Sequence, residues 1–270
     1  MKKLGGKRVL ITGGASGIGL ETAVAFGMEG CEVLITDINE DGLGEAATRI
    51  GETGAVVRTY VNDVTDRVAV EKLAEEVGAV DILVNNAGIG FASEIKDTSI
   101  VDWERLMAIN MWGLIYFIRA FLPPMIEKRS GSIVNISSGQ AFFPIPTWGA
   151  YAATKFFVAG MSEALHYEVA RFGVKVTTVF PYMVSSPFYD EIEADSFFGR
   201  LVVKNLVPLF GSTPEKTARI IVKAVRKGKK NELHHIGNKI GYYFMRLTPH
   251  VVEGAGVGVA WAMSRKGDTD

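Results

Sequence analysis

A tyrosine and a lysine stand four residues apart at the start of an apolar, helix-forming stretch, at Tyr151 and Lys155. Side chains at i and i+4 share one face of a helix, so we expect the phenol and the ammonium to be neighbours. A free phenol has a pKa of about 10, and an adjacent ammonium favours the phenolate. The pair therefore predicts a tyrosine with a lowered pKa that serves as a general acid–base at neutral pH. A solvated helix face is the alternative interpretation.

Two further polar residues belong with this pair. Ser138 ends the apolar run 133–136 and precedes Tyr151 by 13 positions, and its hydroxyl is suited to holding a substrate oxygen while a proton moves. Asn110 lies inside an apolar helical run, where a buried amide needs partners. It is expected to act either as a structural bridge or as part of a proton path.

A glycine-rich turn reads Thr-Gly-Gly-Ala-Ser-Gly-Ile-Gly over 12–19, between an apolar run and a helical one. Gly13 permits the tight turn, Gly17 lets the backbone approach a pyrophosphate, and Gly19 allows the helix to pack closely on the strand. The helix N-terminus adds free N–H groups and the positive end of its dipole. The pattern predicts a dinucleotide site at Gly13, Ser16, Gly17, Ile18 and Gly19, with an ordinary glycine-rich turn as the alternative.

Asp37 ends the second apolar run, 18 residues after Gly19. A carboxylate there accepts hydrogen bonds from both ribose hydroxyls of an adenosine and repels a 2′-phosphate. Ser16 and Ile38 occupy the places where a cation would neutralise that phosphate, so NAD is favoured over NADP. The alternative role for Asp37 is to cap a helix that begins near Asn39.

The elements that must position these residues alternate along the chain. Strands are expected at 8–12, 31–37, 55–61, 80–84, 132–136, 174–180 and around 231–236. Helices are expected at 18–28, 41–50, 66–77, 101–121, 151–172, 214–227 and 239–247, with Pro123 and Pro124 ending the fourth. This alternation predicts a single α/β domain over 1–270, a doubly wound parallel sheet (Rossmann fold) with ligands at the carboxyl ends of its strands. A substrate lid is expected at about 185–212 and a C-terminal extension at about 238–270.

Composition narrows the class of protein. Hydrophobic residues make up 48% and charged residues 22%, which excludes a disordered chain. The net charge of −1 argues against a nucleic-acid partner. One cysteine excludes an intrachain disulfide, and the four histidines show no metal-ligand spacing, so no metal is expected. Without a signal peptide or a long apolar span, the sequence predicts a cytoplasmic protein.

In this order, these residues resemble the short-chain dehydrogenase/reductase family, together with the segments Asn85-Asn86-Ala87-Gly88 and Asn62-Asp63-Val64. The resemblance covers about residues 5–185. It implies that Tyr151 is the acid–base, Ser138 orients the substrate oxygen, and Lys155 lowers the tyrosine pKa and binds the nicotinamide ribose. Asn110 would hold a water that connects the lysine to solvent. Adenosine contacts are implied for Asp63, Val64, Asn86, Ala87 and Gly88, and an assembly of two or four copies is implied as well.

One segment departs from the family pattern. Members commonly carry Pro-Gly-x-Val-x-Thr after the sixth strand, whereas this chain has Pro-Tyr-Met-Val-Ser-Ser at 181–186. Pro181, Val184 and Ser186 match, and the nicotinamide contacts are expected to survive through them. Tyr182 replaces the glycine and adds bulk beside the reacting carbon.

Aromatic and apolar residues gather in two segments, 140–148 and 187–211, that should wall the substrate site. The expected substrate contacts are Ser138, Gln140, Phe143, Tyr151, Tyr182 and Phe188. Apolar walls favour apolar ligands, so a lipophilic alcohol or ketone such as a steroid, retinoid or long-chain compound is predicted. The alternative is that these side chains pack the lid on the body or form a subunit interface. The apolar tail at 239–265 would cover the opening, contact another subunit or, as a third option, lie on a membrane surface.

Three functions follow from the sequence. The leading one is an NAD-dependent oxidoreductase that interconverts a hydroxyl and a carbonyl on a lipophilic substrate. An NADPH-dependent reductase of 3-oxoacyl thioesters is the second, and Asp37 argues against it. The third is a scaffold protein that binds NAD without turnover, which the intact set of Asn110, Ser138, Tyr151 and Lys155 makes less favourable.

Overall fold

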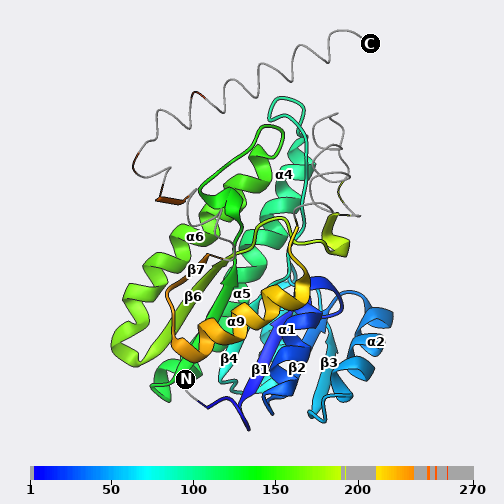
Figure 1. Cartoon of the computed structure of the whole chain (residues 1–270), viewed down its shortest axis with the longest axis vertical. Helices are drawn as coiled ribbons and strands as arrows, with labels where there is room; N and C mark the ends of the chain where they lie inside the picture. Colours follow the sequence, from blue (N-terminus) through cyan, green and yellow to red (C-terminus); the bar gives the residue numbers. More distant parts are fainter. Residues whose placement is uncertain are drawn as a thin grey trace.

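Seven parallel strands form one sheet at the centre of the molecule (Figure 1). The computed structural model describes residues 3–189, 192, 211–233, 242, 243, 247 and 254. The strands lie in the order β3-β2-β1-β4-β5-β6-β7. They are Arg8–Thr12 (β1), Glu32–Asp37 (β2), Val57–Val61 (β3), Ile82–Asn85 (β4), Gly131–Ile136 (β5), Val174–Phe180 (β6) and Asn231–Leu233 (β7). The doubly wound α/β fold is confirmed.

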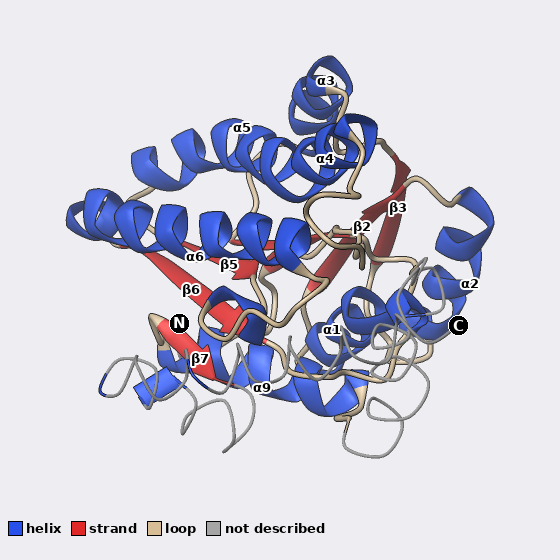
Figure 2. Ribbon diagram, turned by 90° about the horizontal axis from the view of Figure 1, so that it is seen from above, coloured by secondary structure: helices blue, strands red, loops and turns tan. Residues whose placement is uncertain are grey.

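Helices cover both faces of the sheet, as the view from above shows (Figure 2). One layer holds α1 (Gly17–Met28), α2 (Glu40–Gly51) and α9 (Pro214–Lys227). The other holds α3 (Arg67–Val77), α4 (Ile100–Met107), α5 (Leu114–Glu127) and α6 (Gly149–Val169). Short helices complete the described chain at Ala108–Gly113 (a π-helix, η1), Gly139–Ala141 (η2), Ala170–Phe172 (η3) and Pro187–Tyr189 (η4).

Alternate side chains of each central strand enter opposite halves of the core. In β1, Val9 and Ile11 pack with α1 and α9, while Leu10 packs with α3, α5 and α6. Every residue of β4 and β5 is buried. A continuous apolar run without alternation is what burial on both faces of a parallel sheet requires. The sheet edge at the carboxyl ends is therefore held rigidly from both sides.

Helix α5, which precedes β5, is longer than the sequence predicted. Pro123 and Pro124 were expected to end it, but the helix continues to Glu127. A proline inside a helix costs about 3 kcal/mol because it removes a hydrogen bond and crowds the previous turn. Phe117, Phe121 and Met125 of the same helix are buried against the sheet, and this packing outweighs the loss.

A π-helix, η1, divides this long apolar helix between α4 and α5, which the periodicity did not indicate. The segment Ile100–Glu127 is long and apolar enough to cross a membrane by composition alone. Within the described chain it packs on the sheet through its buried face, as the core helix of a globular domain does.

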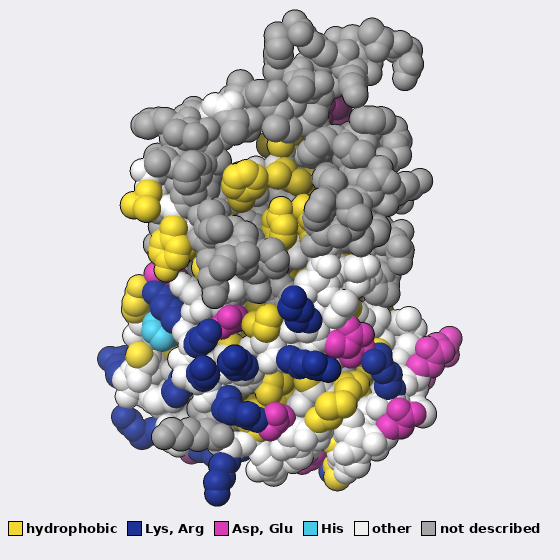
Figure 3. Space-filling view, viewed as in Figure 1, with side chains coloured by type: hydrophobic (Ala, Val, Ile, Leu, Met, Phe, Trp, Pro, Cys, Tyr) yellow, Lys and Arg dark blue, Asp and Glu magenta, His cyan; other side chains and the backbone are white. Residues whose placement is uncertain are grey.

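Other boundaries differ from expectation by a few residues, and α6 begins two residues before Tyr151. The helix expected at 239–247 and most of the expected lid and C-terminal extension lie outside the described residues. The exposed cations of α9 are Lys216, Arg219, Lys223, Arg226 and Lys227. Lys and Arg side chains gather in a band across the lower half of the face drawn in Figure 3.

Candidate active site

A cavity of about 710 Å³ lies at the carboxyl ends of β1, β2, β4, β5 and β6. This is the edge where a doubly wound sheet binds its ligand. The sequence-predicted residues that line it are Gly13, Ser16, Gly17, Ile18, Asp37, Asp63, Val64, Asn86, Ala87, Gly88, Ser138, Tyr151, Lys155, Pro181, Val184, Ser186 and Phe188. The structure therefore brings together, in one cavity, the glycine turn and the expected acid–base pair.

The glycine turn is packed too tightly for side chains. Gly13 and Gly17 have φ of +64° and +53°, a region that favours glycine. A Cβ at Gly13 would lie 2.9 Å from the Cα of Ala87, and a Cβ at Gly19 would lie 1.9 Å from the carbonyl oxygen of Gly13. Gly19 lies outside the cavity lining, so its role is to let α1 approach the strand.

Backbone donors are available at this turn. Ser16 is the N-cap of α1 but its hydroxyl makes no capping bond. The hydroxyl and the first N–H groups of the helix thus face the cavity as donors for an anion. A pyrophosphate fits a turn of this kind.

The side chain of Asn86 stabilises the glycine turn through hydrogen bonds, in addition to lining the cavity. Its Nδ2 donates to the carbonyl oxygens of Thr12 (3.1 Å) and Gly13 (3.0 Å). The hydroxyl of Thr12 in turn accepts from the N–H groups of Asn86 and Ala87, both at 3.0 Å. The segment after β4 is therefore fastened to the end of β1.

Asp37 uses both carboxylate oxygens at the end of β2. One accepts from the N–H of Ala15 and the other from the N–H of Asn39, each at 3.1 Å. Asn39, not Asp37, caps α2, because its side chain accepts from the N–H of Gly42. Asp37 is thus held beside the glycine turn and lines the cavity, where a ribose would meet it.

The loop after β3 closes the same end of the cavity. Asp63 accepts from the N–H and the hydroxyl of Thr65, both at 2.8 Å. Val64 packs against Gly113, where a Cβ would lie 2.8 Å from its Cγ2. Together with Asp37 and the glycine turn, these groups fit the adenosine half of a dinucleotide.

Tyr151 lies in the first turn of α6, and its side chain is hydrogen-bonded to Ser138. Burial raises the pKa of Tyr151 to about 12, although the hydrogen bond with Ser138 lowers it. The sequence predicted the opposite direction. Desolvation of the phenolate by the surrounding aromatic side chains is the larger effect here.

Lys155 lies one turn further along α6, with its Nζ 5.5 Å from the centre of the Tyr151 ring. Its ammonium donates to the carbonyl oxygen of Ile136 at 3.2 Å. Burial lowers the pKa of Lys155 to about 8. The expected neighbourhood of phenol and amine on one helix face is present.

Asn110 lies in the π-helix η1, buried, and is a structural bridge. Its Oδ1 accepts from the N–H of Ile89 at 2.9 Å, and its Nδ2 donates to the carbonyl oxygen of Ile89 (3.0 Å) and to the hydroxyl of Thr154 (3.1 Å). π-turns are frequent at functional sites. This one fixes the segment after β4 beside α6, so the water-holding role of Asn110 stays a prediction.

The segment after β6 forms the end of the cavity next to Tyr151. The N–H of Gly139 donates to the carbonyl oxygen of Pro181 at 2.9 Å, which ties this segment to the residue after Ser138. Met183 has a φ of +42°, and it lines the cavity with Val184 and Ser186. The positive φ falls one residue after the position where family members carry glycine.

Three expected substrate contacts lie outside the cavity lining. Gln140 accepts from the N–H of Ile145 at 3.3 Å and so shapes its own loop. Phe143 and Tyr182 are 40% and 39% exposed. Phe188 does line the cavity, as expected. Sequence reasoning missed Arg105, Ala108 and Ile109, whose i, i+3, i+4 spacing would have placed them on one helix face toward the site.

The described residues contain no cluster of His, Cys, Asp and Glu side chains that would hold a metal ion. The short chain dehydrogenase family matches this sequence over residues 7–196. The chain belongs to that family. Membership places the chain among the short-chain oxidoreductases, and it spans less than half the length of the first curated relatives that it matches.

Similar proteins support the family and the fold. The chain is 37% identical over 236 residues to the probable oxidoreductase EphD of Mycobacterium tuberculosis, covering 82% of this chain but 40% of EphD. It is 34% identical over 226 residues to the 3-oxoacyl-[acyl-carrier-protein] reductase FabG of Thermotoga maritima, covering 82% and 90% of the two chains. A short-chain dehydrogenase/reductase of Burkholderia phymatum, solved in complex with NAD, superposes with a TM-score of 0.83 at 24% identity over 91% of this chain and 95% of that one.

Proposed function

We propose that this short-chain dehydrogenase uses NAD(H) to interconvert a hydroxyl and a carbonyl on a mainly apolar substrate, with Tyr151 as the acid–base. One observation carries the proposal: the phenol of Tyr151, hydrogen-bonded to Ser138, faces the same cavity as Lys155 and the glycine turn. A scaffold that binds a dinucleotide without turnover has no need for this arrangement.

The proton transfer follows from these three side chains. In reduction, Ser138 and Tyr151 hold the carbonyl oxygen, and Tyr151 donates its proton as negative charge develops there. In oxidation, the phenol oxygen accepts the proton of the substrate hydroxyl. The bound nicotinamide supplies or accepts the hydride. Lys155 stabilises the phenolate that remains after the proton has left.

Asp37 supports NAD rather than NADP. Its carboxylate is held beside the glycine turn by two backbone N–H groups, where it accepts hydrogen bonds from ribose hydroxyls and repels a 2′-phosphate. Ser16 and Ile38 line the cavity next to it. The solved relative from Burkholderia phymatum holds NAD, in line with this assignment.

The likeness to FabG favours a second candidate, the NADPH-dependent reduction of 3-oxoacyl thioesters. Asp37 opposes it because NADPH brings a phosphate to that position. Comparing kcat/KM with NADH and NADPH on the same ketone separates the two. A preference for NADPH would favour the FabG-like function.

Tyr151→Phe tests the proposed function. The variant keeps the ring and its packing but loses the acidic proton, so we expect turnover to fall at least about a hundredfold. Binding of NADH, followed by fluorescence titration, should change little. Ser138→Ala should lower kcat by a similar order, because the substrate oxygen loses its second partner. Full turnover by Tyr151→Phe would exclude the proposed role.

Further proposals rest on the sequence. The balanced charge argues for a small-molecule substrate and against a nucleic-acid partner. We propose a cytoplasmic homodimer or homotetramer, to be tested by light scattering and by fractionation of cells that express the protein.

A further inference from the structure

A second phenol stands in the active-site wall, at Tyr189. It ends the short helix η4 and lines the same cavity as Ser138 and Tyr151. Its N–H donates to the carbonyl oxygen of Ser186 at 3.1 Å, which fixes the backbone of this residue next to the end of the cavity that holds Tyr151. The proton transfer proposed above for Ser138, Tyr151 and Lys155 does not use it.

Four aromatic rings form a closed circuit that orients Tyr189. Its ring centre lies 5.3 Å from that of Phe188 and 6.4 Å from that of Trp148. Phe188 lies 5.8 Å and Trp148 5.7 Å from the ring of Tyr151. Contacts of this kind stabilise a fixed arrangement of the rings. Tyr189 is thus joined to Tyr151 through two separate ring contacts.

The absence of a side chain at Gly90 leaves the space that Phe188 and Ile192 occupy. A Cβ at Gly90 would lie 2.6 Å from Cζ of Phe188 and 2.8 Å from Cδ1 of Ile192. The aromatic wall therefore rests on the segment that also carries Gly88 and Ile89, which Asn110 holds beside α6. Trp148 is buried behind the wall, whereas Phe188 and Tyr189 face the cavity.

Tyr189 is partly buried in the cavity wall, and among the residues that the structure describes no hydrogen bond to its hydroxyl is present. Burial raises the pKa of Tyr189, and the nearby Tyr151 and Tyr182 raise it further, so the phenol is neutral at physiological pH. A neutral phenol both donates and accepts one hydrogen bond. Because Tyr189 lines the cavity, a polar group of a bound ligand can take up a hydrogen bond with this hydroxyl.

We infer that Tyr189 binds a second polar group of the substrate, at a distance from the carbonyl that Ser138 and Tyr151 hold. The substrate class that fits is a ring-containing, mainly apolar carbonyl compound with one further oxygen or nitrogen. The faces and edges of Phe188 and Tyr189 suit its ring, and the phenol of Tyr189 suits its second polar atom. This inference rests on the proposed function, since it assigns the substrate of the same site.

Matched ketone pairs test the inference. We would measure kcat and KM with NADH for cyclohexanone and 4-hydroxycyclohexanone, and for 2-tetralone and 6-hydroxy-2-tetralone. The wild-type enzyme should prefer the hydroxylated member of at least one pair. Tyr189→Phe should reduce that preference about tenfold, mainly through a higher KM for the hydroxylated ketone. A loss shared equally by both members of a pair would mean a packing role only and would overturn the inference.

Two further variants sharpen the result. Tyr167→Phe removes an exposed phenol far along α6 and should leave the preference as in the wild type. Tyr182→Phe removes the other phenol near Tyr189, and if it abolishes the preference while Tyr189→Phe does not, the assignment is wrong. Turnover by Tyr151→Phe would contradict the proposed function instead, so the two failures are distinguishable. The absence of any preference in the wild-type enzyme would overturn the substrate class.

Discussion

Tyr151 and Lys155 are both buried, and burial favours the neutral form of each. It raises the pKa of the phenol to about 12 and lowers that of the amine to about 8. At neutral pH the tyrosine therefore holds its proton, ready to donate it to a carbonyl oxygen. The lysine is still mostly charged there, in surroundings that penalise the charge. The charge of Lys155 at neutral pH thus costs the folded protein stability.

Lys155→Met should make this cost measurable. A pKa of about 8 in the folded state against 10.5 when unfolded means that the unfolded chain binds more protons between these values. The contribution of Lys155 to the free energy of unfolding therefore rises with pH across this window and is least favourable below it. We expect Lys155→Met to be more stable than wild type at pH 7 by about 2 kcal/mol, after allowing for the lost hydrogen bond to Ile136.

Urea unfolding of both proteins at neutral and at alkaline pH checks this, and the gain should shrink as the pH approaches 10.5. Lys72→Met, at an exposed position of α3, is the matched control and should show no such pH dependence. A variant that is less stable than wild type at neutral pH would show that the ammonium stabilises the fold.

At the residue scale, the sequence predicted that Ser138, Tyr151 and Lys155 lie close together, but it did not predict the direction in which the pKa of Tyr151 shifts. The spacing of Tyr151 and Lys155 fixes a shared helix face, and Ser138 follows from its place at a strand end. The pKa of Tyr151 depends instead on its burial, to which Phe188 contributes from a distant segment and Trp148 from the start of the same helix. Spacing along the chain carries no information about that burial.

At the scale of elements, the junction of β1 and α1 has the least tolerance for added atoms. A Cβ at Gly19 would lie 1.9 Å from the carbonyl oxygen of Gly13 and 2.7 Å from Nδ2 of Asn86. Neither neighbour can move without disturbing the turn, because Asn86 also holds the carbonyl oxygens of Thr12 and Gly13.

Gly19→Ala should therefore destabilise the fold by about 1–3 kcal/mol and weaken NADH binding at least about tenfold. Gly44→Ala is the control: this glycine lies exposed within α2 with nothing within 4 Å of the added Cβ. It should gain about 0.5–1 kcal/mol from the lower flexibility of the unfolded chain. Thermal unfolding and fluorescence titration measure both. Unchanged cofactor affinity in Gly19→Ala would show that the turn tolerates a shift of α1.

The periodicity of hydrophobic residues predicted the order and type of the helices and strands. It predicted neither the continuation of α5 past its prolines nor the π-helix η1 before it. Pro123 and Pro124 are local signals for a helix end, and packing of Phe117 and Phe121 on the sheet overrides them. The π-helix at Asn110 was not predicted, and the bonds that Asn110 makes there reach Ile89 and Thr154 in other segments, which spacing along the chain does not indicate.

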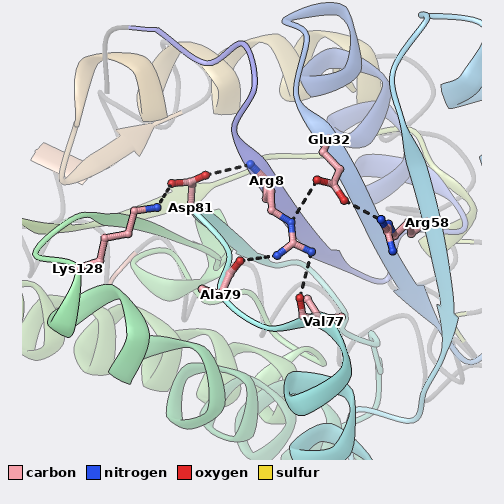
Figure 4. Close-up of polar contacts among 7 residues, drawn as sticks. All are labelled: Arg8, Glu32, Arg58, Val77, Ala79, Asp81 and Lys128. Carbon is pink, nitrogen blue, oxygen red and sulfur yellow. Dashed lines mark hydrogen bonds and ion pairs between the residues drawn. The ribbon is translucent and has the colours of Figure 1, made fainter.

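At the scale of the whole molecule, charged groups gather at the amino-terminal ends of β1, β2 and β4, and Figure 4 shows their contacts. None of them lines the cavity. Asp81 accepts from Lys128 at 2.7 Å, from Lys7 at 3.1 Å and from the N–H of Arg8 at 3.1 Å. Arg8 continues the network to Glu32 at 3.2 Å. These bonds join β1, β2, β4 and α5 at the edge where no ligand is expected.

Asp81→Asn should weaken the fold without changing catalysis. Burial pushes the pKa of Asp81 up, but the hydrogen bonds from Lys128, Arg8 and Lys7 outweigh it and hold the pKa below its ordinary 3.8. A depressed pKa contributes stability above that value and loses it as the pH falls. We expect a loss of about 1–2 kcal/mol near neutral pH that shrinks in acid below pH 3.8. Urea unfolding of wild type and Asp81→Asn over this pH range measures the loss, and an unchanged kcat/KM is the control. If the difference in free energy of unfolding did not change with pH, the ion pairs of Asp81 would not be its cause.

The fold order and the location of the site at the carboxyl ends of the strands follow from the sequence alone. The aromatic circuit does not, since Tyr189 comes from a segment far along the chain from Trp148 and Tyr151 at the start of α6, and hydrophobicity alone suits many arrangements. Phe188 was expected in the wall, while Gly90, which makes room for it, gave no signal.

Cys31 is the one thiol of the sequence, buried beneath α1 with its Sγ donating to the carbonyl oxygen of Leu4 at 3.3 Å. Burial, followed by Glu29 and Asp81, raises its pKa to about 11, which leaves little thiolate to react. We therefore expect the native chain to react very little with maleimides. A cysteine introduced on an exposed surface would be the sole attachment point for a fluorophore or spin label, which opens the motions of this enzyme to spectroscopy without first removing a native residue.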